Sequence, residues 1–361
     1  MKKIYPFYIR STVILFGLIL LLYALSSLRD ILTPICFSVM LAILLNRLVV
    51  KLERFSVPKF WAITMAVLLA FTVIAGVAYF ISTQILNFAD DLPLLKKRFI
   101  ALFSQFQHLI SEALGVNIKQ QDQWIGEAES ALKPFIGQTL GNVAGTLGVL
   151  FLLPVYTFLL LFYKNHFLTF LYEIFGNSDS ERVADVLQET KGAIQRYMIG
   201  LLLEGIVVAV LNTAALFLFD IKYAVLLGIT AALLNLLPYI GGFIAILLPV
   251  IVATITKDGI HTQVGITAAY LFIQFVDNHV LIPLIVSSRV KINAFISIVI
   301  VLLGGAMWGV PGMFLSIPFI GVLKIVFDRI DELKPWGKML GTEEATVQKL
   351  KLIKRRKTIH E

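Results

Sequence analysis

Long apolar runs constrain this chain more than any other feature. Eight stretches approach or exceed the length of about 20 residues that a helix needs to cross the hydrocarbon core of a bilayer. They are residues 11–28, 31–46, 60–85, 143–163, 198–219, 223–256, 264–287 and 293–327. Only 15% of the 361 residues are charged, against about 25% in soluble domains. The sequence therefore predicts an all-α, polytopic membrane helix bundle of about eight spans, two of them discontinuous.

The first discontinuous run is 223–256, which is too long for one straight span and contains LLNLLPYIGG. Pro238 removes an amide hydrogen and clashes with the preceding turn, and Gly241 and Gly242 permit a backbone turn. Broken backbone in a membrane must be buried in protein or line a watery cavity. We therefore predict a substrate-binding site that includes Asn235, Pro238, Tyr239, Gly241 and Gly242. A kink that serves packing alone is the alternative.

The second discontinuous run is 293–327, which contains GGAMWGVPGMFLSIP. Its helix breakers are Gly304, Gly305, Gly309, Pro311 and Gly312. Two interrupted segments in one chain are the best sequence sign of a secondary transporter's binding site. We include these five residues in the predicted substrate site, opposite the first break. The pattern does not decide whether this run crosses once or is re-entrant.

Ionisable residues inside apolar runs are functional candidates because a charge there is costly. Asp277 and Asn278 lie in the run 264–287, and Glu204 lies early in the run 198–219. We predict that Asp277 and Asn278 contact substrate, and that Asp277 and Glu204 couple transport to an ion. The alternatives place the Asp277 segment at a membrane interface and Glu204 near the cytoplasmic surface.

Motifs for enzymatic chemistry do not occur in the sequence. It contains no GxxxxGK[ST], HExxH, CxxC or GxSxG, and its five histidines are scattered. We therefore expect no enzyme, no metal site and no cofactor. The net charge of +8 is attributed to basic cytoplasmic loops rather than to nucleic-acid binding. With eight spans, the basic clusters before residue 11, between 47 and 59, and in the tail fall on one side, so both termini are expected in the cytoplasm.

The predicted organisation has four parts. Membrane helices at 1–85 precede an amphipathic helical insertion at 86–140 on the outer side. The transport core at 141–327 contains a second, cytoplasmic insertion at 164–197. A basic cytoplasmic tail at 328–361 is expected to be surface-bound or disordered.

Three stretches carry a resemblance to a known family. FYKNHFLTFL, LLNLLPYIGGFIAILLP and FVDNHVLIPLIVSSRVKINAFISIVIVLLGGAMWGVPGMFLSIP resemble the signatures of the autoinducer-2 exporter family of bacterial permeases. One departure is Asp277, where the family commonly has glutamate. The resemblance implies an oligomeric permease of the bacterial inner membrane. Members are associated with export of the quorum-sensing signal autoinducer-2, and some with sodium–proton exchange.

Three functions therefore remain open. The first is export of a small polar solute, with sodium or protons as candidate coupling ions, and the second is sodium–proton antiport. The third is a non-transporting scaffold that organises membrane partners through 86–140 and 164–197. The expected partners are a small solute, the lipid bilayer and further copies of the chain.

Overall fold

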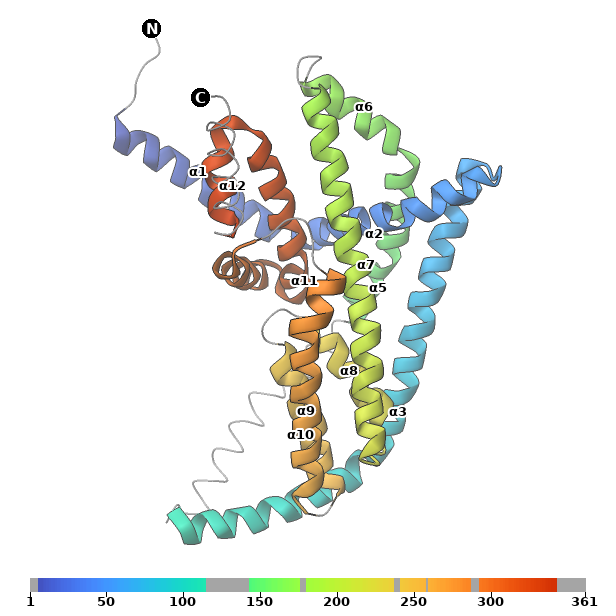
Figure 1. The fold of residues 1–361 in the computed structure, drawn as a ribbon, viewed down its shortest axis with the longest axis vertical. Helices are drawn as coiled ribbons and strands as arrows, with labels where there is room; N and C mark the ends of the chain where they lie inside the picture. Colours follow the sequence, from blue (N-terminus) through green and yellow to red (C-terminus); the bar gives the residue numbers. More distant parts are fainter. Residues whose placement is uncertain are drawn as a thin grey trace, which may run out of the picture. The chain divides into compact units, whose positions relative to one another are not determined.

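The computed structural model describes residues 6–114, 143–175, 180–236, 241–257, 259–286 and 292–342. These residues are almost entirely helical and contain no strand, apart from an isolated bridge between Ile292 and Gly341. The predicted all-α class is confirmed (Figure 1). The α-helices are α1 (Phe7–Ser27), α2 (Arg29–Arg54), α3 (Lys59–Leu114), α5 (Val143–Phe162), α6 (Lys164–Phe175), α7 (Ser180–Leu218), α8 (Ala224–Asn235), α9 (Gly241–Thr256), α10 (His261–Val276), α11 (Ala294–Arg329) and α12 (Lys334–Leu340). A π-helix, η1 (Asp277–Val286), continues α10, and a 3₁₀ turn, η2 (Asp331–Leu333), precedes α12.

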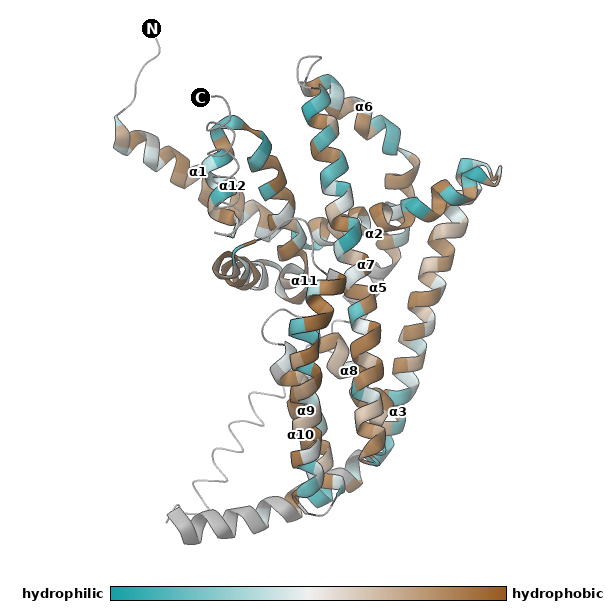
Figure 2. Ribbon diagram, in the orientation of Figure 1, coloured by the Kyte–Doolittle hydropathy of each residue, from teal (hydrophilic) through white to brown (hydrophobic). Residues whose placement is uncertain are grey.

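The helices account for the apolar runs of the sequence. Within the described residues, six helices are long and apolar enough to cross a membrane by length and composition, or seven if the bent pair α5 and α6 counts as one span. This number counts α11 as a single helix. The shorter helices α8 and α9 together occupy the run 223–256. In Figure 2 the last half of α7 and most of α10 are hydrophobic, whereas the first half of α7 is largely hydrophilic. The large apolar side chains of α1 are exposed, as expected for a helix that faces lipid. The chain is therefore a multi-pass membrane protein.

Contacts divide the chain into two compact units. Unit 1 comprises residues 1–67, 153–199 and 288–361, and unit 2 comprises 68–152 and 200–287. The helices α3, α5 and α7 each continue from one unit into the other. The α3 helix continues without a break through 85/86, where the outer amphipathic insertion was expected to begin. The α7 helix likewise continues through 197/198, where the cytoplasmic insertion was expected to end and the next span to begin. No proline or glycine interrupts the helix at either place, so residues 86–114 continue the spanning part of α3, and residues 180–197 lead directly into the spanning part of α7.

The core of unit 2 is formed where the end of α7 packs with α8, α9 and α10. Its buried residues include Leu216, Leu227, Ala253 and Ile266. The α8 and α9 helices contain 12 and 16 residues, or about 18 and 24 Å at 1.5 Å per residue. Each is shorter than the hydrocarbon core of about 30 Å. A Cβ atom added to Gly241 would lie 1.7 Å from the carbonyl oxygen of Leu234. The chain thus returns tightly against the end of α8, and α8 and α9 form a helical hairpin.

A second helical hairpin lies in unit 1, inside α11. Gly309 has a left-handed φ of 65° and interrupts the helix. The Ser316 hydroxyl oxygen lies 2.9 Å from the carbonyl oxygen of Ile300 and 2.6 Å from that of Gly312. Residues 16 apart on a straight helix, such as Ile300 and Ser316, would be separated by about 24 Å. A Cβ atom on Gly312 would lie 2.0 Å from the Gly304 carbonyl oxygen. The run 293–327 therefore folds back at Gly309 and forms a helical hairpin.

The chain after α11 is folded as far as residue 342. The α12 helix packs on α11, and the Asn293 amide donates to the Leu340 carbonyl oxygen over 2.9 Å. The first part of the predicted tail is thus ordered against the hairpin. Beyond residue 342 the tail lies outside the described residues.

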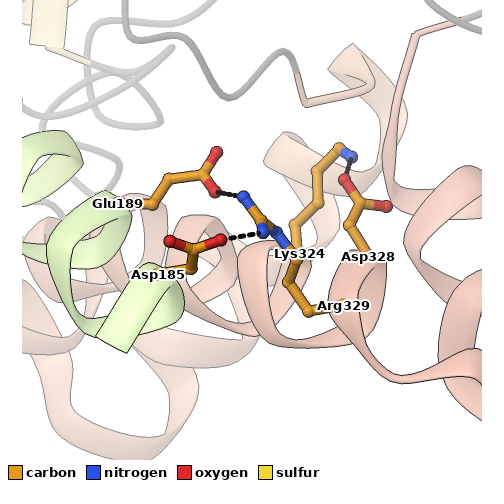
Figure 3. Close-up of polar contacts among 5 residues, drawn as sticks. All are labelled: Asp185, Glu189, Lys324, Asp328 and Arg329. Atoms are coloured by element: carbon orange, nitrogen blue, oxygen red, sulfur yellow. Dashed lines mark hydrogen bonds and ion pairs between the residues drawn. The ribbon is translucent and has the colours of Figure 1, made fainter. Parts of the chain in front are cut away.

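Ion pairs fasten the end of α11 to the first half of α7 (Figure 3). The Arg329 guanidinium donates to Asp185 over 3.0 Å and to Glu189 over 2.8 Å. One turn earlier on α11, Lys324 pairs with Asp328 over 2.6 Å. All five side chains belong to unit 1, so these contacts stabilise that unit.

Candidate functional site

Asp277 is the centre of a buried polar site in unit 2, at the junction of α10 and η1. The residue is only 1% exposed. The Asn235 amide nitrogen donates to Asp277 Oδ2 over 2.8 Å, and Gln274 Nε2 approaches the same oxygen at 3.5 Å. The other oxygen, Oδ1, is buried and has no hydrogen-bond partner among the described residues. A buried carboxylate oxygen without a hydrogen-bond partner is costly. A proton or a cation bound at Oδ1 would remove this cost.

The backbone changes its hydrogen-bonding pattern at the same residue. From Asp277 to Val286 the chain is a π-helix that contains Pro283. Proline lacks an amide hydrogen and would clash with the carbonyl four residues earlier in an α-helix. The wider π-turn accommodates it, and π-helical segments occur frequently at functional sites. The local sequence thus places a carboxylate where the backbone is irregular.

Glu204 reaches this region from α7. It is 4% exposed. A Cβ atom on the adjacent Gly205 would lie 3.6 Å from Leu236 Cδ2, so this part of α7 packs at the end of α8. The structure therefore buries Glu204 where α7 packs at the end of α8.

The hairpin turn contributes backbone and amide groups to the site. A Cβ atom on Gly242 would lie 2.6 Å from Gln274 Oε1 and 3.4 Å from Asn235 Oδ1. Gly242 thus lets α9 approach the two amide side chains that contact Asp277. The resulting site combines two carboxylates with amide oxygens, and oxygen ligands of this kind suit hard cations.

The other predicted site residues lie in several places. Asn278 is exposed, although Gln274 Nε2 approaches its side-chain oxygen at 3.5 Å. Pro238 and Tyr239 lie outside the described residues. Gly304, Gly305, Gly309, Pro311 and Gly312 belong to the α11 hairpin of unit 1, and each unit is described by itself.

Gln274 is a site residue that the sequence reading did not select. Its side chain contacts both Asp277 and Asn278. Residues three and four apart share a helix face. Gln274 precedes Asp277 by three residues and Asn278 by four, and this spacing was the signal in the sequence that could have identified it. His279 points elsewhere: its Nδ1 lies 2.9 Å from the Phe275 carbonyl oxygen, and its ring stacks on Phe275.

The described part of the chain does not group three or more His, Cys, Asp or Glu side chains in the manner of a transition-metal centre. The site instead offers carboxylates and amides beside a broken helix within a multi-pass bundle. This combination is typical of a membrane transporter or permease.

Comparison with known proteins assigns the family. The model of the AI-2E family transporters matches residues 12–332, and the chain belongs to this family. The resemblance seen in the sequence is confirmed.

Named relatives are similar over most of their length. The "Putative transport protein YrrI" of Bacillus subtilis is 23% identical over 82% of this chain and 86% of its own length. The "AI-2 transport protein TqsA" of Escherichia coli is 21% identical over 88% of this chain and 91% of its own length. The "Putative permease PerM" of Escherichia coli is 27% identical over 82% of this chain and 86% of its own length. These names support a membrane transporter or permease.

Proposed function

We propose that this protein is a secondary transporter of the bacterial cytoplasmic membrane in which Asp277 and Glu204 bind the coupling ion. The observation that carries the proposal is the unpartnered Oδ1 of Asp277, buried in the unit that also buries the carboxylate of Glu204. Neither carboxylate has a basic partner among the described residues. Two such charges repel strongly away from water. Binding of one proton or one cation would relieve this repulsion.

The solute is proposed to bind beside the same break in unit 2. Gly241, Gly242, Asn235 and Asn278 offer backbone and amide groups that suit a small polar molecule. TqsA is named as an AI-2 transport protein, which supports autoinducer-2 or a similar solute as the exported substrate. The basic cytoplasmic loops favour an orientation with both termini in the cytoplasm.

Sodium–proton antiport is the second candidate, and the carboxylate pair specifically favours it. A pair of carboxylates can hold either a proton or a sodium ion. If the site opens alternately to the two sides of the membrane, the pair exchanges one ion for the other. In this mode Asp277 and Glu204 would serve the transported ions themselves rather than an accompanying solute.

Reconstitution distinguishes these functions. The purified protein would be sealed in liposomes that contain a pH-sensitive dye, and sodium would be added outside. The test variant is Asp277→Asn, which keeps the size of the side chain. The control is Asp90→Asn, which makes the same change at an exposed position of unit 2.

A sodium-dependent pH change that Asp277→Asn abolishes and Asp90→Asn retains would support antiport. If the wild-type trace is flat, transport of labelled autoinducer-2 would be measured in the same vesicles. Loss of that transport in Asp277→Asn would support solute export. Full activity of correctly inserted Asp277→Asn protein in either assay would refute the assigned role of Asp277.

A further inference from the structure

A charged hollow of about 370 Å³ lies in unit 2 beyond the end of the α3 span. Its walls include Asp91 and Arg98 from α3, Asp220 and Lys222 from the turn between α7 and α8, and Lys257 after α9. The volume falls in the range of about 300–1,000 Å³ that is typical of small-molecule pockets. None of these residues belongs to the Asp277 site.

Both carboxylates of the hollow are already paired. Lys222 Nζ lies 2.5 Å from Asp91 Oδ2, and the Tyr223 hydroxyl donates to the same oxygen. Lys257 Nζ lies 2.6 Å from Asp220 Oδ2. The hydrogen bond from Lys222 holds the pKa of Asp91 below its usual value, and the bond from Lys257 does the same for the pKa of Asp220. Both carboxylates are therefore charged at neutral pH and neutralise the two lysines.

Arg98 remains as the surplus cation. Its Nη1 donates to the Thr256 carbonyl oxygen over a long 3.4 Å, and it has no carboxylate partner among the described residues. Three cations and two carboxylates give these five side chains a net charge of +1. A guanidinium presents its donors as a planar fork that matches a carboxylate or phosphate group. The hollow is therefore complementary to one negative oxyanion.

We propose that this hollow binds a compact molecule through a single oxyanion group, a carboxylate or a phosphate, held by Arg98. The lysines next to it retain further donor hydrogens for the remaining polar groups of the ligand. The α3 span ends nearby at Phe88, so a lipid headgroup is one candidate source of the phosphate and a dissolved solute is the other. Both present the same phosphate chemistry to Arg98. This site is independent of the function proposed for Asp277.

Binding to the purified full-length protein tests the proposal. Equilibrium dialysis in neutral detergent would use radiolabelled inorganic phosphate, with acetate as competitor. A second arm would place the protein in nanodiscs that contain phosphatidylglycerol or only phosphatidylcholine, and would measure retained lipid by native mass spectrometry. The test variants are Arg98→Gln and Arg98→Lys. The control is Lys97→Gln, which removes the same charge at the adjacent exposed position outside the hollow.

We expect saturable phosphate binding that Arg98→Gln weakens at least tenfold and Lys97→Gln leaves unchanged. Arg98→Lys should be intermediate, because it keeps the charge but loses the planar fork. Retention of phosphatidylglycerol alone, lost in Arg98→Gln, would equally support the site and identify a lipid as its source. Binding of neither probe, or equal weakening by Arg98→Gln and Lys97→Gln, would overturn the proposal.

Discussion

Replacing Gly304 with alanine should force apart the two halves of the α11 hairpin. The added Cβ would lie 2.1 Å from Ser316 Oγ and 2.5 Å from the Gly312 carbonyl oxygen. The serine hydroxyl can rotate away, but the carbonyl oxygen belongs to the backbone and moves only if the opposite half of the hairpin moves. The substitution therefore tests whether the run 293–327 folds back at Gly309.

The size of the effect follows from the contacts. Overpacking of a well-packed interior costs typically about 1–3 kcal/mol. Gly321 is the matched control: it lies on the same helix, but a Cβ atom there would meet nothing within 4 Å. Gly321→Ala should instead gain about 0.5–1 kcal/mol from helix propensity. The two variants should differ by about 1.5–4 kcal/mol, or about 3–16 °C in Tm at roughly 2–4 °C per kcal/mol.

Thermal unfolding of the purified proteins in the same detergent provides the assay. The double variant Gly304→Ala/Gly312→Ala adds a second test, because the two positions share one contact and their effects should not add. Equal Tm values for Gly304→Ala and Gly321→Ala would refute the hairpin contact. Additive effects in the double variant would show that the two glycines do not face each other.

Two further predictions concern ion pairs in the separate units. Arg329→Gln removes the half-exposed ion pairs with Asp185 and Glu189 and should lower the free energy of unfolding by no more than about 1 kcal/mol for each pair. The difference in Tm from wild type should shrink at high salt. A difference that does not change with salt would contradict an ion-pair origin. For Asp91, whose pKa Lys222 holds below its usual value, the stabilisation is present above the ordinary aspartate pKa and is lost as pH falls through the lowered one. The Tm curves of wild type and Asp91→Asn should therefore be separate at neutral pH and converge in acid, whereas parallel curves would exclude this linkage.

The sequence predicted the class and the breaks because both depend on local chemistry. Apolar length identified the spans, and proline and glycine identified the interrupted runs. The fold-back of α11 was not predictable from the same signals. It depends on the approach of Gly304 to Gly312 across the turn, and the order of residues along the chain does not report which residues meet across a turn.

The candidate site was only partly predictable for a similar reason. Asp277 stood out because an ionisable residue is rare inside an apolar run. The burial of Glu204 depends on how α7 packs at the end of α8, and the pattern of a single helix does not report this packing. Gln274 is an ordinary polar residue in sequence, and only its contacts with Asp277 and Asn278 mark it.

The central claim is that the buried carboxylates Asp277 and Glu204 hold a proton that a coupling cation replaces. The most direct measurement is proton release from purified protein in weakly buffered detergent when sodium chloride is added, with choline chloride as the ionic-strength control. We predict saturable release specific to sodium in the wild-type protein, and its loss in folded Asp277→Asn and Glu204→Gln variants. No release from folded wild-type protein, or undiminished release from both variants, would contradict the account.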